Sequence, residues 1–415
     1  MRGPANALTG SIIRDNSISA KVPETEAGDV VSGNFGDYQL GIYLNGARGV
    51  VPELPVGFAA TEALAEDTMD PKILGYVAGG AGDEHTQRAN VAAFNRLGIM
   101  PRMLVGAGQR DLSIELFGHH LPTPLFLAPV GVLGAVAADG DLAAAASAAE
   151  LGTPMIASTL SNAPLEQVRA AAGDTPGFFQ LYPPADRELA ESLVHRAEAA
   201  GYTGIVITLD TWVNGWRPRD LTAAYLPMLS GQCLANYLTD DRFRKLLAEQ
   251  GSADPAAAVM LWASLFGNPA MTWDDLAWFR SLTSLPIILK GICSPEDTRR
   301  ALDGGMDGIY CSNHGGRQAN GGIPAIDCLP GVVEAAGGAP VLFDSGVRSG
   351  VDALRALALG ATAVGIGRPY VYGLAVGGQA GVTHVMRSLL AEADLTMAVN
   401  GYPDLESLRG SLHRL

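Results

Sequence analysis

The sequence lacks the features of a membrane or nucleic-acid-binding protein. It contains no run of 18 apolar residues, so we expect no membrane span. Residues 1–37 have no continuous apolar stretch of a secretory signal, and their polar, glycine- and serine-containing composition predicts a flexible extension. Basic residues are scarce, because 28 Lys and Arg stand against 43 Asp and Glu, a net charge of −15. This balance argues against nucleic acid or an anionic membrane as partner.

Cysteine is also scarce, and two common motifs are missing. The four cysteines, Cys233, Cys293, Cys311 and Cys328, show no CxxC spacing. We therefore expect no zinc or other metal site and no disulfide framework, and we predict a cytoplasmic location. No GxGxxG motif follows an early apolar run, which ranks a doubly wound dinucleotide-binding sheet below a barrel.

A regular alternation of apolar and helix-forming segments begins near residue 124. The helix-forming segments end at glycine, a common helix stop. The apolar runs suit buried parallel strands. They cover residues 124–131, 154–159, 177–182, 204–210, 286–292, 308–313, 340–346 and 363–369. Eight such units predict an α/β protein with a (β/α)8 TIM barrel.

Two segments lie outside this repeat. Residues 38–123 precede the first strand, and we expect them to form an N-terminal helical cap. Residues 211–285 separate the fourth and fifth strands and are too long for one helix, so they predict a lid-like insertion or an oligomer contact. The domains expected are thus the 1–37 extension and a barrel domain over 38–415.

Polar residues stand at the ends of six successive predicted strands. In barrel enzymes, the chemistry is at the carboxyl ends of the strands. A protein core does not favour such groups, so their repetition predicts an active site at this edge. From the third strand to the eighth they are Gln180 and Tyr182, Thr208 and Asp210, Lys290, Ser312 and His314, Asp344 and Ser345, and Arg368.

The segment 342–369 carries the pattern of a phosphate site. Gly346 and Gly367 allow backbone N–H groups to approach a ligand, and Arg348 and Arg368 can complete the site. Lys290 ends an apolar strand and needs a negative partner there. A reduced flavin would be such a partner, and a Schiff-base lysine is the alternative.

The stretch "SNHGGRQ" places His314 and Arg317 at the end of the sixth strand. His314 can accept a proton, and Asp210 can orient it and stabilise its charged form. Arg317 can bind a carboxylate through two hydrogen bonds. The combination suits proton abstraction from a small hydroxy acid that is held by its carboxylate.

The motifs "SNHGGRQ", "ILKGI", "FQLY", "ITLD", "FDSGVRSG" and "GIGRP" resemble the FMN-dependent 2-hydroxy acid oxidase and dehydrogenase family over residues 38–410. Within it, "YVAGGAGDEHTQRAN", "MPRML" and "SLLAEADLTMAV" are most similar to the lactate 2-monooxygenases. The resemblance implies FMN as cofactor, a 2-hydroxy acid and O2 as substrates, and a homo-tetramer or homo-octamer.

The resemblance also implies residue roles. His314 is then the catalytic base, supported by Asp210, while Arg317 and Arg217 hold the substrate carboxylate with Tyr76 and Tyr182. Lys290 lies by the N1–C2 carbonyl edge of the flavin. The other implied cofactor contacts are Ser158, Gln180 and Thr208 to the ring; Ala128, Pro129, Val130 and Gly131 along its N5 edge; and Ser312, Asp344, Ser345, Gly346, Arg348, Gly367 and Arg368, including the ribityl and phosphate contacts.

The outcome of the reaction stays open in the sequence. Lactate and O2 would give acetate, CO2 and water if the keto acid stays bound, whereas an oxidase would release keto acid and H2O2, acting on a different or larger acid such as mandelate. Pro183, Asn214 and Met228 stand where the monooxygenases have aromatic residues. Two rivals are inosine-monophosphate dehydrogenase, which shares the phosphate signature but needs a nucleophilic cysteine, and a non-catalytic flavoprotein.

Overall fold

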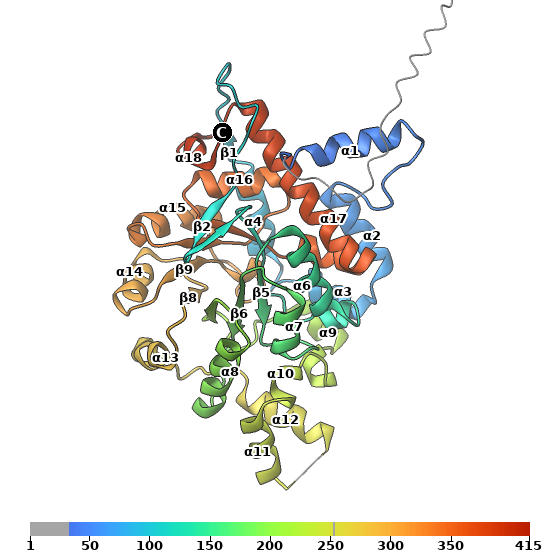
Figure 1. The fold of residues 1–415 in the computed structure, drawn as a ribbon. Coiled ribbons are helices and arrows are strands. Elements are labelled where there is room, and N and C mark those ends of the chain that lie inside the picture. Colours follow the sequence, from blue (N-terminus) through green and yellow to red (C-terminus); the bar gives the residue numbers. More distant parts are fainter. Residues whose placement is uncertain (1–32, 252–253) are drawn as a thin grey trace, which may run out of the picture. The chain divides into compact units, whose positions relative to one another are not determined.

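The computed structural model describes residues 33–251 and 254–415, so most of the predicted 1–37 extension lies outside the described residues. Eight parallel strands form a closed barrel (Figure 1). In barrel order they are β4 (Leu125–Leu127), β5 (Met155–Ser158), β6 (Gly177–Leu181), β7 (Gly204–Thr208), β8 (Ile287–Lys290), β9 (Gly308–Cys311), β10 (Val341–Phe343) and β11 (Ala363–Ile366). The predicted TIM barrel is confirmed.

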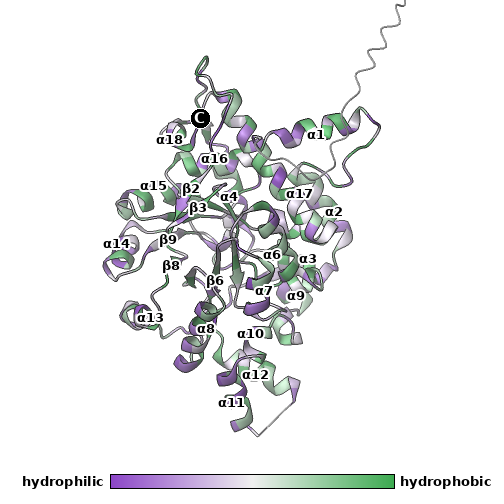
Figure 2. Ribbon diagram, in the orientation of Figure 1, coloured by the Kyte–Doolittle hydropathy of each residue, from purple (hydrophilic) through white to green (hydrophobic). Residues whose placement is uncertain are grey.

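The barrel strands are apolar because both of their faces are covered. Phe126, Phe178, Val206 and Tyr310 pack inside the barrel, and alternate residues of the same strands face the helices. The hairpin of β2 (Ile114–Leu116) and β3 (His119–Leu121) packs against this inner cluster. Figure 2 shows the strands in hydrophobic colours and the outer helices with hydrophilic faces.

One main helix follows each barrel strand. These helices are α6 (Gly140–Leu151), α7 (Leu165–Ala171), α8 (Arg187–Ala199), α13 (Leu276–Leu282), α14 (Pro295–Asp303), α15 (Ala325–Ala336), α16 (Gly350–Ala358) and α17 (Arg368–Asn400), with the short α5 (Leu133–Val136) before α6. Side-chain caps at Asp186, Ser294 and Ser349 start three of them. In the described residues, no helix combines the length and apolar character needed to cross a bilayer.

The region before the barrel is helical, as predicted for the cap. It contains α1 (Asp37–Gly46), α2 (Phe58–Thr68), α3 (Pro71–Ala78) and α4 (His85–Phe94). Helices α1 and α2 pack along α17 (Figure 1). Strand β1 (Leu97–Ile99) pairs with the C-terminal β12 (Leu412–Arg414), which follows α18 (Leu405–Leu408).

The segment between β7 and β8 folds into short helices near α8 (Figure 1). They are α9 (Pro218–Ala223), η1 (Pro227–Ser230), α10 (Ala235–Leu238), α11 (Asp241–Glu249), α12 (Pro255–Leu265) and η2 (Trp273–Asp275), before barrel helix α13. The Asn236 side chain donates to the Thr159 carbonyl (2.9 Å) and accepts from the Leu165 amide (2.7 Å). The insertion is therefore hydrogen-bonded to the loop after β5.

Candidate active site

The first element of the site is a histidine–aspartate pair. The Nδ1 atom of His314 lies 2.8 Å from Oδ1 of Asp210, across strand β8. Thr211 donates to the same carboxylate oxygen at 3.1 Å. Burial lowers the pKa of His314, Asp210 opposes this, and Lys290 adds to the lowering. The imidazole is therefore neutral at pH 7, with Asp210 fixing its proton on Nδ1 and leaving Nε2 as a base.

The backbone around His314 explains the glycines of the motif. His314, Gly315 and Gly316 have φ values of +58°, +62° and +75° within η3 (His314–Gly316). Such values are uncommon for a non-glycine residue and mark a constrained turn at His314. A Cβ at Gly316 would lie 2.5 Å from the Gln87 backbone nitrogen, so the close contact with α4 requires glycine.

Two arginines lie close to one tyrosine ring. The guanidinium carbons of Arg317 and Arg217 are 4.8 Å and 5.9 Å from the ring centroid of Tyr76, on α3. Arg317 donates to the backbone carbonyls of Tyr76 and Gly79, each at 2.6 Å, and Arg217 donates to the Arg317 carbonyl at 3.0 Å. Burial and the Arg217 charge lower the pKa of Arg317. An anion placed here would relieve this repulsion.

Lys290 joins a polar network that reaches the histidine. Its Nζ donates to Ser312 Oγ at 2.9 Å and lies 3.7 Å from Asp344 Oδ2. Ser312 Oγ donates to Asp344 Oδ1 at 2.5 Å and accepts from the His314 amide at 3.1 Å. Tyr310 donates to Asp344 Oδ2 at 2.8 Å. Asp344 is thus the negative partner that the position of Lys290 required.

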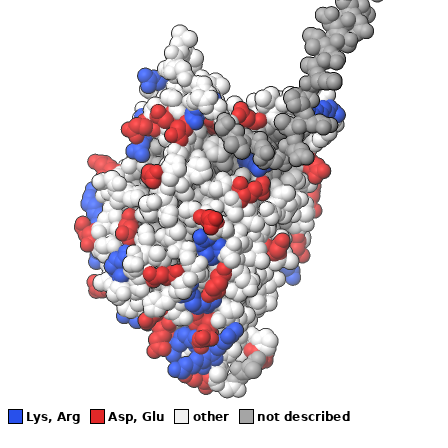
Figure 3. All heavy atoms as spheres, in the orientation of Figure 1, with Lys and Arg blue, Asp and Glu red and all other residues white. Residues whose placement is uncertain are grey.

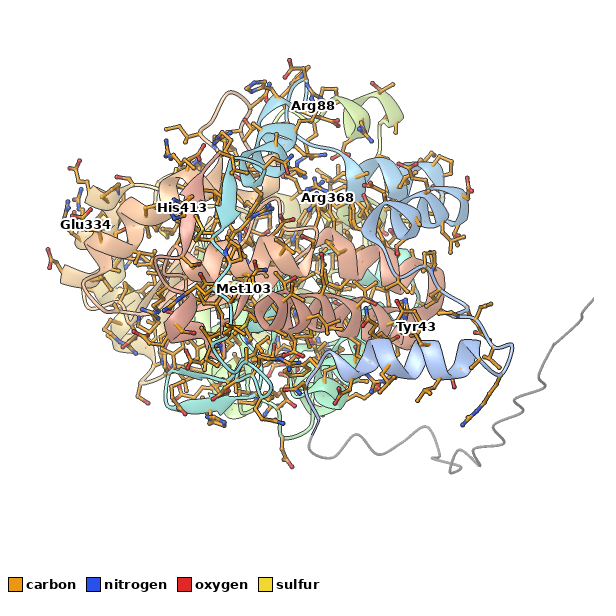
Figure 4. All side chains as sticks on the ribbon, turned by 90° about the horizontal axis from the view of Figure 1, so that it is seen from above. Tyr43, Arg88, Met103, Glu334, Arg368 and His413 are labelled. Carbon is orange, nitrogen blue, oxygen red and sulfur yellow. The ribbon has the colours of Figure 1, made fainter. Side chains whose placement is uncertain are left out.

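The predicted phosphate-binding residues meet at the start of α17. Arg368 donates to the Val77 carbonyl (3.0 Å) and Gly79 carbonyl (2.9 Å), and Arg348 donates to its neighbouring Val347 carbonyl (2.9 Å). Burial and the charges of Arg317 and Arg348 lower the pKa of Arg368 to about 9. In Figure 4, Arg368 lies among the helices, whereas Arg88 lies at the rim. These clustered cations need an anionic ligand.

A single cavity that is partly open to solvent unites most of the predicted residues. It is lined by Tyr76, Ala128, Pro129, Val130, Gly131, Tyr182, Arg217, Lys290, His314, Arg317, Asp344, Ser345, Gly346, Arg348, Gly367 and Arg368. Of the rest, Asp210 and Ser312 lie directly behind His314 and Lys290.

Three predicted ring contacts do not line this cavity. Ser158, Gln180 and Thr208 end strands β5 to β7 and are almost fully buried. Ser158 donates to the Gln180 side chain at 3.1 Å, which in turn donates to Thr208 at 3.0 Å. These side chains bond to one another in this arrangement, while the second N–H of Gln180 and the hydroxyl hydrogen of Thr208 remain for a ligand.

Several cavity residues were not predicted from the sequence. Leu160 follows β5 and Phe266 directly follows α12, and both line the cavity. Asn214 and Met228, noted above for their lack of aromatic character, also line it, whereas Pro183 does not. Proximity to strand ends could have indicated Leu160, but no local pattern marks Phe266.

The barrel and its cationic cavity define an α/β-barrel enzyme for an anionic cofactor and substrate. The sequence profile described as FMN-dependent dehydrogenase matches residues 65–414. An L-lactate oxidase of Lysinibacillus sphaericus (strain C3-41) is 42% identical over 356 residues, covering 86% of this chain and 92% of that one. An FMN-dependent alpha-hydroxy acid dehydrogenase of Penicillium citrinum is 39% identical over 373 residues, covering 89% and 93%.

Solved structures agree with these relatives. A mandelate oxidase with 3,3-difluoro-2-hydroxy-3-phenylpropionic acid matches with a TM-score of 0.76 and 35% identity, covering 87% of this chain and 99% of that one. The chain belongs to the FMN-dependent dehydrogenase family of 2-hydroxy acid oxidoreductases. This assignment replaces both rival interpretations of the sequence.

The residues present fit FMN, on which the family depends. Gly367 is the N-cap residue of α17 and makes no side-chain cap, and none of the atoms tested lies within 4 Å of the position that a Cβ would take there. Backbone N–H groups, Arg348 and Arg368 can therefore hold a phosphate. Residues 128–131 offer an apolar edge to a flat ring, and Lys290 offers a cation to it.

Proposed function

We propose that this protein oxidises an L-2-hydroxy acid with O2 as electron acceptor, and that it acts on lactate as a 2-monooxygenase, giving acetate, CO2 and water. The single observation that carries the proposal is the meeting of His314, with its Asp210 partner, and the Arg217–Arg317 pair in one cavity. A base and a carboxylate clamp together suit a 2-hydroxy acid.

The residues divide the work as follows. Arg317 and Arg217 bind the substrate carboxylate, and the Tyr76 ring lies close to both. Burial raises the pKa of Tyr182, so its hydroxyl stays protonated and can donate to the substrate. His314 Nε2 accepts the proton from the substrate, and Asp210 stabilises the imidazolium that forms. Bound FMN would supply the two-electron redox chemistry that connects the hydroxy acid to O2.

The insertion supports the monooxygenase outcome. Met228 and Phe266 bring it to the cavity, and the hydrogen bonds of Asn236 fasten it to the barrel. A closed insertion would retain the keto acid next to peroxide formed in the cavity, which is the condition for oxidative decarboxylation. The 42% identity to an L-lactate oxidase favours a second candidate, an oxidase that releases the keto acid and H2O2.

Product analysis with L-lactate in air tests the proposal. Acetate and CO2 with little peroxide support the monooxygenase, and pyruvate with one equivalent of H2O2 supports the oxidase. If neither lactate nor mandelate bleaches the flavin of the holoenzyme under anaerobic conditions, the proposed class of substrate is wrong. The variant His314→Gln is the control, because it removes the base and should abolish bleaching.

A further inference from the structure

One part of the cavity surface is apolar and has no role in the chemistry above. Its members in or next to the insertion and in the loop after β5 are Leu160, Met228 and Phe266, which we call the apolar wall. Leu160 comes from the barrel, whereas Met228 lies in η1 and Phe266 at the end of α12. Met228 is only 2% exposed, although it belongs to a surface insertion. A methionine buried against a substrate cavity calls for an explanation.

The apolar wall is attached to the barrel on two sides. The Phe266 ring packs edge-on against Tyr182 with 5.3 Å between centroids, and the Trp262 ring of α12 lies 4.9 Å from Phe266. After η1, the Ala235 amide donates to the Ser161 carbonyl at 3.0 Å. The backbone that carries Met228 is therefore held in place, and its adaptability lies in its side chain, which has three rotatable bonds.

The chemistry at the other side of the cavity directs the substrate side chain to this wall. The carboxylate is taken by Arg217 and Arg317, and the C2 hydrogen must face His314. The remaining C2 substituent then faces the rest of the lining, to which the insertion and the loop after β5 contribute the apolar wall. Leu160, Met228 and Phe266 offer no charge to a second carboxylate, and only the Met228 thioether can accept a hydrogen bond from a hydroxyl group, a weak one.

We propose that Met228 is a specificity-determining residue, and that the substrates are 2-hydroxy monocarboxylic acids with unbranched apolar side chains, from the methyl of lactate to the butyl of 2-hydroxyhexanoate. The inference rests on the proposed function and refines its substrate class. Rotation of the methionine thioether makes room for added methylenes, and each one is then buried against Leu160 and Phe266.

The test is anaerobic flavin bleaching of the holoenzyme, followed by stopped flow with L-lactate, L-2-hydroxybutanoate, L-2-hydroxyhexanoate and L-malate. For the wild type, we expect kred/Kd to rise about fourfold per methylene, the factor that corresponds to one buried CH2. The value of kred/Kd for malate should be at least roughly a hundredfold lower than for lactate, because the apolar wall offers no partner to the second carboxylate.

Two substitutions of Met228 and one control distinguish an effect on the substrate side chain from a general loss of activity. Met228→Phe fills the cavity with a ring that cannot bend, so the hexanoate-to-lactate ratio should fall at least tenfold. Met228→Ala enlarges the room for the substrate side chain, so the hexanoate-to-lactate ratio should rise above that of the wild type. Met260→Phe is the matched control, because Met260 lies on α12 of the same insertion but is 66% exposed, and its ratio should not change.

The outcomes distinguish the two levels of the proposal. If no hydroxy acid bleaches the wild-type flavin, the proposed function fails. If lactate bleaches the flavin but kred/Kd does not rise with chain length, only the refined substrate class and the role of Met228 are refuted. The same holds if Met228→Phe lowers kred/Kd for lactate and for 2-hydroxyhexanoate by the same factor. If Met228→Phe does not retain FMN, the wild-type series decides the substrate class, a hexanoate-to-lactate ratio in Met228→Ala above that of the wild type supports the role of Met228, and a ratio equal to or below it refutes that role.

Discussion

Replacement of Asp210 by asparagine tests the central pair of the site. The variant Asp210→Asn would keep an oxygen near His314 Nδ1 but lose the negative charge that now lies 2.8 Å away. Two unit charges about 4 Å apart attract by about 4 kcal/mol at an effective dielectric constant of 20. Since 1.36 kcal/mol corresponds to a tenfold change, loss of most of this attraction should slow flavin reduction by roughly 10² to 10³.

The pH profile gives a second readout for Asp210, which acts through His314. Burial and Lys290 lower the pKa of His314, and Asp210 is the group that opposes them. In Asp210→Asn the pKa of His314 should therefore fall further, so the acid limb of kcat/KM moves to lower pH while the plateau drops. Stopped-flow bleaching with lactate from pH 5 to 9, at equal flavin content, measures both effects.

Thr211→Val is the graded comparison for this experiment. It removes only the hydroxyl that donates to Asp210 Oδ1 at 3.1 Å, so we expect a loss of about fivefold, for a hydrogen bond worth about 1 kcal/mol. Flavin reduction in Asp210→Asn within fivefold of the wild type, or an acid limb that moves to higher pH, would refute the assigned role of Asp210.

Three further changes probe the cofactor site and the fold. Arg348→Met should weaken FMN binding by roughly 10- to 150-fold, the range for a charge-assisted hydrogen bond. Fluorescence titration of the apoprotein with FMN measures this, and an unchanged affinity for FMN would contradict the phosphate site. Lys290→Met should make the flavin midpoint potential more negative in spectroelectrochemistry, because a cation next to reduced flavin is lost. An unchanged potential would contradict the placement of Lys290 next to the flavin. Burial raises the pKa of Asp141 from 3.8 to about 6, so the folded state keeps a proton that the unfolded chain releases, and stability falls from about pH 4 to pH 6. Asp141→Asn should then raise the free energy of unfolding at pH 8 by up to about 3 kcal/mol and leave it unchanged below pH 4. Equal urea midpoints of the variant and the wild type at pH 8 would contradict this prediction.

The barrel was predictable because its strands are buried on both faces and read as continuous apolar runs. The predicted runs are longer than the strands: 286–292 contains β8 (Ile287–Lys290), and 363–369 contains β11 (Ala363–Ile366). The extra residues turn out of the barrel and enter the site, as Arg368 does. Apolar character alone cannot separate these two environments.

The site could be predicted only in part. Polar residues at strand ends, such as Lys290 and His314, contradict burial in a core and are therefore visible in the sequence. Phe266 and Met228 are apolar residues in or next to short helices of the insertion, and their position at the cavity depends on how these helices pack on the barrel. Ser158 and Gln180 were predicted as ring contacts, but the sequence could not show that they bond to each other.

The charge distribution of the cavity has a consequence for association kinetics. Arg217, Arg317, Lys290, Arg348 and Arg368 all face the cavity, while the chain as a whole carries a net charge of −15. Figure 3 shows acidic and basic side chains interspersed over the visible face, with no broad basic region to guide an anion. A hydroxy acid anion is thus repelled at long range and attracted only at the mouth. Because salt screens charges beyond about 8 Å at physiological ionic strength, it weakens the repulsion more than the attraction. Substrate capture should then become faster as salt is added, the reverse of electrostatic steering.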